Sequence, residues 1–122
     1  MTKIRPAKLD ERLDSGGPPF VLDIRPRTDF QQTAIENSHN VPVYTDLQSG
    51  DETTLRDRLD EIPRDRDVVV VCKLGMVAKR ATAVLDEEGY DAATLLGGIS
   101  GWNGYQAGTL GYKLRSLRWK YL

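Results

Sequence analysis

The sequence contains few of the residues that form disulfides, bind metal ions or act as catalytic bases in small domains. Its 122 residues include one cysteine, Cys72, and one histidine, His39. A single cysteine forms no internal disulfide, and the two residues together supply no His/Cys cluster for a tetrahedral zinc site. Chains of about 100–150 residues usually make one domain. We therefore expect one domain that folds on its own hydrophobic core, with no metal and no cofactor.

The sequence also lacks an excess of positive charge and a long hydrophobic run. Seventeen basic residues against eighteen acidic ones give a net charge of −1, unlike the basic balance of a nucleic-acid-binding domain. The longest aliphatic run, 68–71, is far shorter than the ~20 residues that span a bilayer. These absences predict no nucleic-acid partner, no membrane span and a cytoplasmic location.

The positive charge is concentrated at the C-terminal end. Residues 105–122 hold four cations and no acid, so residues 1–104 carry 13 basic against 18 acidic residues. One helical face of this end would carry Leu110, Leu114, Leu117 and Tyr121. This pattern predicts that the basic tail 109–122 packs on the body of the domain. Docking of its basic face on an acidic partner or a membrane surface is the alternative.

Short apolar runs alternate with amphipathic stretches along the rest of the chain. Strands are expected at 20–24, 41–43, 68–71 and 92–96, and helices at 6–13, 28–34, 53–61, 76–88 and 99–107. The four valines at 68–71 are typical of a central strand buried on both faces. The alternation predicts an α/β fold, a doubly wound parallel sheet of about five strands with helices on both faces.

Cys72 occupies a position that favours chemistry. It directly follows the valine strand, and a short turn with Gly75 leads from it into the next helix. Ligands of open α/β sheets bind beyond the carboxyl ends of the strands. The amide N–H groups and the dipole of a helix N-terminus stabilise an anion there, which for a cysteine is its own thiolate. A lone cysteine is otherwise most often a small buried hydrophobe, but this position favours a reactive role.

The residues around Cys72 resemble a known family. The stretch 72–78, Cys-Lys-Leu-Gly-Met-Val-Ala, is similar to the active-site loop of the rhodanese-like sulfurtransferases, whose pattern is Cys-x-x-Gly-x-Arg-Ser. Three further segments resemble family motifs in the same order: Val-Leu-Asp-Ile-Arg at 21–25, Asn-Val-Pro at 40–42 and Leu-Leu-Gly-Gly-Ile-Ser-Gly-Trp at 95–102. Together they cover about residues 3–108, which are expected to form a rhodanese-like domain.

The resemblance implies a sulfurtransferase reaction at Cys72. In the family, the loop cysteine attacks the outer sulfur of thiosulfate or of a persulfide donor, holds that sulfur as a persulfide, and passes it to cyanide or a thiol. The backbone amides of the loop would form the anion cradle. The cradle residues are Lys73, Leu74, Gly75, Met76, Val77 and Ala78. The resemblance also implies that Asp23 supports the loop by hydrogen bonding.

The loop departs from the family pattern in its charge. Val77 and Ala78 stand where the family has its arginine and serine, and Ala34 stands where it has a histidine. An arginine fork normally supplies paired contacts to an oxyanion. Lys73, Arg80 and Arg25 are the remaining cations that can serve a donor anion. An apolar rim better suits a less charged donor, for example a persulfide on a partner protein.

Two other functions compete with sulfur transfer. Loss of the arginine leaves open a rhodanese-like protein-binding or regulatory module with weak or no catalysis. A phosphatase would use a related Cys-x5-Arg loop, but the sixth residue after Cys72 is Ala78, which leaves the phosphoryl oxygens without a clamp. Because the sequence contains no second cysteine, the outer sulfur of a persulfide on Cys72 can pass only to an external acceptor.

Overall fold

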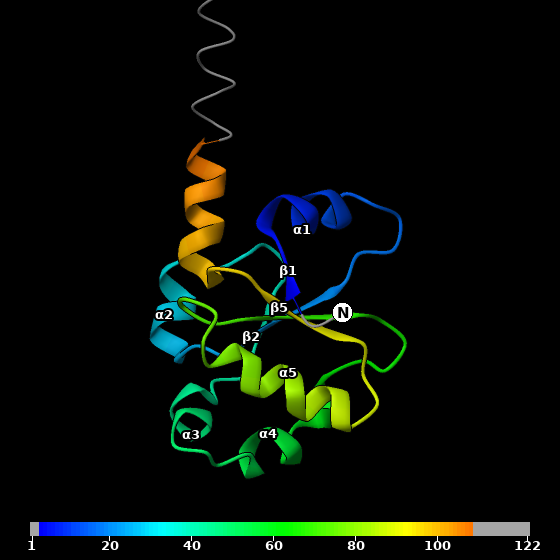
Figure 1. Cartoon of the computed structure of the whole chain (residues 1–122), viewed down its shortest axis with the longest axis vertical. Helices are drawn as coiled ribbons and strands as arrows, with labels where there is room; N and C mark the ends of the chain where they lie inside the picture. Colours follow the sequence, from blue (N-terminus) through cyan, green and yellow to red (C-terminus); the bar gives the residue numbers. More distant parts are fainter. Residues whose placement is uncertain (1–2, 109–122) are drawn as a thin grey trace, which may run out of the picture.

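The computed structural model describes residues 3–108. They form a five-stranded sheet in the order β1-β5-β4-β2-β3, in which every pairing is parallel (Figure 1). The strands are β1 (Lys3–Ile4), β2 (Phe20–Asp23), β3 (His39–Asn40), β4 (Val68–Val71) and β5 (Ala92–Leu95). The valine strand β4 lies in the middle of the sheet, as its composition predicts.

The valines of β4 show why this strand is central. Val68 and Val70 belong to one hydrophobic cluster, and Val69 and Val71 belong to a second. Successive side chains of a strand point to opposite faces, so β4 contributes to a core on each side of the sheet. Only a strand covered on both faces can bury four consecutive valines.

Helices cover both faces of the sheet. They are α1 (Pro6–Leu13), α2 (Arg27–Gln32), α3 (Tyr44–Gln48), α4 (Thr53–Asp57) and α5 (Ala78–Glu87), with a 3-10 helix η1 (Leu59–Glu61) and a last helix over 98–108. Leu47, Leu55 and Leu85 place α3, α4 and α5 in the first cluster. Leu9 and Trp102 place α1 and the last helix in the second cluster, on the other side of the sheet in Figure 1. The doubly wound α/β fold is confirmed.

Some element boundaries differ from the prediction. The expected strand 41–43 is wrong, because the pairing with β2 is made by His39 and Asn40 and the backbone leaves the sheet before Pro42, which has no amide N–H to donate. The expected helix 53–61 divides at Arg58 into α4 and η1. The expected helix 28–34 ends at Gln32, where Thr33 turns to an extended conformation.

Two elements had no sequence signal. The strand β1 has two residues, and α3 has five. Elements of that length show no apolar period, so their formation depends on tertiary contacts: β1 pairs with β5, and Leu47 of α3 is fully buried. The predicted tail 109–122 lies outside the described residues. Within residues 3–108, no helix is long and apolar enough to cross a membrane.

Candidate active site

The site is centred on Cys72, the residue that follows β4. The carboxyl ends of β4 and β2 lie side by side, because Asp23 pairs with Val71 and the Ile24 amide donates to the Val71 carbonyl at 2.9 Å. The Cys72 side chain is 1% exposed and packs in the cluster that includes Val77 and Ala81. The sequence therefore brings Cys72 to the edge of the sheet at which ligands of α/β folds bind.

Two backbone amides point at the Cys72 sulfur. The Gly75 amide N–H donates to Sγ at 3.1 Å, and the Ala78 amide N–H donates at 3.4 Å. Gly75 has φ +97°, a conformation that residues with a Cβ rarely adopt. Ala78 is the first residue of α5, so its N–H has no partner within the helix and lies at the positive end of the helix dipole. This arrangement stabilises negative charge on sulfur.

The loop is held from behind by the start of the last helix. The Ile99 amide donates to the Cys72 carbonyl at 2.8 Å, and the Ser100 amide donates to the Lys73 carbonyl at 3.1 Å. A Cβ on Gly98 would lie 2.3 Å from the Cys72 carbonyl oxygen, a distance that atoms do not reach without displacement. The glycine pair at 97–98 thus lets the C-terminal segment approach the cysteine loop and hydrogen-bond it.

A buried threonine pair holds the start of α5. The Thr82 hydroxyl donates to the Ala78 carbonyl at 3.0 Å, and its oxygen lies 2.8 Å from the Thr94 hydroxyl oxygen. Both side chains are buried. The pair links β5 to the residue whose amide bonds the sulfur. Sequence reasoning missed these residues, because neither an isolated threonine in a helix nor one in a strand shows which partner it faces.

The family model that matches the chain is the rhodanese-like domain, over residues 5–105. The chain belongs to the rhodanese-like domain family. It is 33% identical over 90 residues to an adenylyltransferase and sulfurtransferase of Zea mays, which covers 73% of this chain and 19% of the relative. It is 30% identical over 103 residues to a sulfurtransferase of Allochromatium vinosum, covering 84% of this chain and 88% of that protein.

The likeness extends to solved structures. A rhodanese-related protein from Thermoplasma volcanium superposes with a TM-score of 0.72 at 26% sequence identity, covering 86% of this chain and 93% of that one. Among the sequence relatives, this chain spans about a fifth of the length of the maize protein and most of the Allochromatium protein. The common part is therefore the rhodanese-like domain itself.

The acidic residue of β2 does not reach the loop of this rhodanese-like domain in the way we expected. The Asp23 carboxylate accepts its hydrogen bonds from Arg25: from the backbone amide at 3.0 Å and from the guanidinium at 2.8–3.1 Å. Within the described chain, these are the side-chain partners of Asp23. Both residues are buried, so the buried carboxylate has its hydrogen-bond partners in Arg25 and not in the cysteine loop.

The cations near the loop are engaged to different degrees. Arg25 also donates to the Thr33 carbonyl at 2.6 Å, so its buried guanidinium is bound to protein oxygens through Nε and Nη2. Arg80 donates to the Leu47 and Gln48 carbonyls at 2.8 and 3.2 Å, at the C-terminal end of α3. Lys73 and Arg80 are both exposed. Of the three cations singled out, Lys73 is therefore the one that is both exposed and not bound to a protein oxygen among the described residues.

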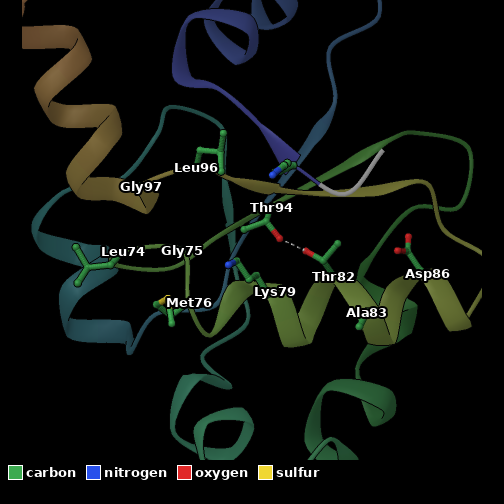
Figure 2. Close-up of a pocket in the computed structure, with 11 residues that line it drawn as sticks. Leu74, Gly75, Met76, Lys79, Thr82, Ala83, Asp86, Thr94, Leu96 and Gly97 are labelled. Atoms are coloured by element: carbon green, nitrogen blue, oxygen red, sulfur yellow. Dashed lines mark hydrogen bonds between the residues drawn. The ribbon is translucent and has the colours of Figure 1, made fainter.

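The remaining loop residues form a rim around the cysteine. Leu74 and Met76 are exposed, whereas Val77 is 8% exposed and belongs to the core. A pocket of about 460 Å³ lies beside the loop, between α5 and the strands β5 and β1 (Figure 2). Among residues 3–108, no group of three or more His, Cys, Asp or Glu side chains is placed to hold a metal ion.

Proposed function

We propose that this rhodanese-like domain transfers sulfane sulfur, with Cys72 as the persulfide carrier. The observation that carries the proposal is the pair of amide hydrogen bonds to the Cys72 sulfur. Such donors stabilise the thiolate before attack and the charge that develops on sulfur during transfer. The names of the maize and Allochromatium relatives, both sulfurtransferases, support the same activity.

The reaction needs no outside oxidant. The Cys72 thiolate attacks the outer sulfur of a persulfide R–S–SH, a new S–S bond forms on Cys72, and the bond between the donor's two sulfurs breaks. The donor leaves as R–S⁻, and Cys72 becomes Cys72–S–SH. A thiophilic acceptor, a second thiolate or cyanide, then attacks the outer sulfur and releases the Cys72 thiolate. The step is nucleophilic catalysis without an adjacent base.

The donor class follows from the missing arginine. Val77 stands at the family's arginine position and is buried in the core, and Arg25 and Arg80 are bound to protein oxygens. A thiosulfate dianion near the loop would meet the exposed lysines Lys73 and Lys79 as point charges, without the bidentate clamp of an arginine. We therefore propose a persulfide, small or protein-bound, as the preferred donor rather than thiosulfate.

Separate assays with each donor test this proposal. Cysteine persulfide or thiosulfate is supplied at the same concentration with cyanide as the acceptor, and the rate of thiocyanate formation is measured above the rate without protein, because cyanide also attacks a persulfide directly. The protein-dependent rate should be at least about tenfold higher with the persulfide, a difference of about 1.4 kcal/mol in activation free energy, and Cys72→Ala should give only the rate without protein. A higher protein-dependent rate with thiosulfate would contradict the donor assignment. A protein-dependent rate in Cys72→Ala would contradict the whole mechanism.

The second candidate is a rhodanese-like binding or regulatory module. It is favoured by the same observation, the valine in place of the arginine at position 77. A binding module would take up no sulfur from any donor, yet would retain the buried cysteine and the loop conformation. The donor experiment separates the two candidates, because the carrier gives protein-dependent thiocyanate formation with at least one donor.

A further inference from the structure

The cysteine loop carries the most exposed large hydrophobic side chains of the described residues. Leu74 is 61% and Met76 is 70% exposed, and the other large hydrophobic side chains among residues 3–108 are buried or partly buried. They flank Gly75, whose amide donates to the Cys72 sulfur. Exposed apolar side chains gathered at one place mark a contact surface. This surface adjoins the sulfur.

A groove continues this surface along the edge of the sheet. Its volume is about 460 Å³, and its walls come from the cysteine loop, α5, the end of β5 and the first residue of β1. Figure 2 shows Leu74 and Met76 at one end, the Thr82–Thr94 pair in the middle and Asp86 further along α5. Its length along α5, from Met76 to Asp86, suits a short extended segment better than a small anion.

Unpaired lysines outnumber acidic residues at the groove. Lys3 and Lys79 line it, and Lys73 precedes Leu74 on the loop. None of these lysines takes part in an ion pair among residues 3–108. Asp86 is the one acidic residue in the lining. This face is therefore cationic on a chain whose residues 1–104 carry more acid than base.

We propose that the exposed Leu74 and Met76 and this groove form the docking site for a protein that donates sulfur to Cys72. Because the groove carries lysines, we expect the donor to have carboxylates beside its persulfide. Because Leu74 and Met76 are exposed, we also expect an apolar side chain next to those carboxylates. The chain's own tail does not fit, because residues 109–122 carry four cations and no acid. The assignment rests on the proposed function for the sulfur, whereas the docking surface can be tested without any transfer.

Peptide binding tests the docking surface directly. Two fluorescein-labelled pentapeptides, Leu-Glu-Ser-Glu-Leu and Leu-Lys-Ser-Lys-Leu, are titrated with the full chain at low and high ionic strength, and fluorescence anisotropy is measured. The acidic peptide should bind about three- to tenfold more tightly at low ionic strength, since each exposed ion pair contributes modestly. High salt should remove most of this difference. Equal binding of the two peptides would overturn the proposal.

Matched variants locate the binding. Lys79→Glu should bring the ratio of the two affinities to about one or below, whereas Lys8→Glu, the same charge change on α1, should leave the ratio unchanged. Leu74→Ser should weaken both peptides, and Leu74→Met should retain binding. A ratio that falls equally with Lys79→Glu and Lys8→Glu would show only a long-range charge effect and would overturn the docking site. A stable dimer in sedimentation, lost with Leu74→Ser, would instead assign the surface to a second copy.

Transfer to peptide thiols separates this inference from the proposed function. The persulfide form of the chain is mixed with Leu-Glu-Cys-Glu-Leu or Leu-Lys-Cys-Lys-Leu, and loss of sulfur from the chain is followed by intact mass. Sulfur exchange between thiols is reversible, so a peptide that accepts sulfur from Cys72 binds in the same complex as one that donates it. The acidic peptide should react about three- to tenfold faster. Equal rates with an intact Cys72 persulfide would overturn docking alone. Preferential binding with no persulfide would overturn the proposed function alone.

Discussion

At the scale of single residues, Gly98 decides how closely the C-terminal segment approaches the cysteine loop. Its φ is +57°, and a Cβ there would lie 2.3 Å from the Cys72 carbonyl oxygen and 2.6 Å from the Lys73 carbonyl carbon. Those two carbonyls accept hydrogen bonds from the start of the last helix. The family motif at 95–102 pointed to this glycine, but the contact with the loop required the structure.

Substitution of Gly98 should therefore damage both stability and the site. We expect Gly98→Ala to lower the free energy of unfolding by at least about 2 kcal/mol, from the positive φ and the overlap with backbone atoms. Gly104→Ala is the matched control, because it lies in the same helix with open space around it and should stabilise by about 0.5–1 kcal/mol. Urea unfolding measures both; equal effects of the two substitutions would contradict this role of Gly98.

Glu61 gives the fold a dependence on acid. Arg58 donates to the Glu61 carboxylate, and His39 Nε2 lies 2.8 Å from it. These contacts, the one from Arg58 first, lower the pKa of Glu61 from 4.5 to about 2. A carboxylate with a depressed pKa in the folded state stabilises the fold above its ordinary pKa, and that stability is lost as the pH falls from about 4.5 towards 2.

The acid dependence can be measured with Glu61→Gln. At pH 7 the variant should unfold at lower urea than the parent chain, by no more than about 1 kcal/mol because the group is partly exposed. The difference should shrink between pH 5 and pH 3, as the parent carboxylate begins to protonate in the unfolded state. A difference that is constant from pH 7 to pH 3 would show that Glu61 contributes through packing alone.

At the scale of elements, sequence periodicity predicted the parts of the site that are long and regular. The four valines of β4 and the apolar face of α5 with Ala81, Val84 and Leu85 fix the strand, the helix and the turn between them. Cys72 therefore falls at a strand end before a helix N-terminus, as predicted. The exact start of α5 at Ala78 rather than residue 76 was not predictable, because the apolar period of a helix does not mark its first residue to within a turn.

Side-chain contacts between elements could not be predicted from the sequence. The Thr82–Thr94 pair joins α5 to β5, Arg80 joins α5 to the end of α3, and Asp23 turns to Arg25 instead of the loop. Each depends on which side chains face each other after the elements pack, and no local pattern records that. The backbone hydrogen bonds from the last helix to the loop are missing from sequence reasoning for the same reason.

Thr82 should act as a positioning residue for the amide of Ala78. Thr82→Val removes the hydrogen bond to the Ala78 carbonyl and leaves the buried Thr94 hydroxyl without this partner, which should cost about 1–3 kcal/mol. It should also lower the protein-dependent rate of sulfur transfer from cysteine persulfide to cyanide by about tenfold, since the loosened Ala78 amide stabilises less of the charge that develops on the Cys72 sulfur. Thr82→Ser should restore the rate. An unchanged rate in a folded Thr82→Val variant would limit the pair to a purely structural role.

At the scale of the whole molecule, composition and alternation were sufficient to predict an α/β fold, and the family membership confirms the resemblance found in the motifs. The edges of the sheet were not predictable, because β1 and β3 have two residues each and exist only as partners of β5 and β2. The division into a domain over 3–108 and a tail, and a cytoplasmic location, stay predictions.

The molecule combines a buried cysteine with a cationic, partly apolar face beside it. The sulfur is held by two amides, and the exposed Leu74 and Met76 border the groove at the sheet edge. Cys72 is the sole thiol in the given sequence. The proposed function therefore predicts that sulfur carried on Cys72 passes to an acceptor outside this sequence.

Intact mass spectrometry of the full chain after incubation with cysteine persulfide, or with thiosulfate, shows directly whether Cys72 takes up sulfur. We expect a mass increase of one sulfur atom that disappears on addition of cyanide and is absent from Cys72→Ala. Gain of sulfur in Cys72→Ala, or no gain from either donor in a folded parent chain, would contradict Cys72 as a persulfide carrier.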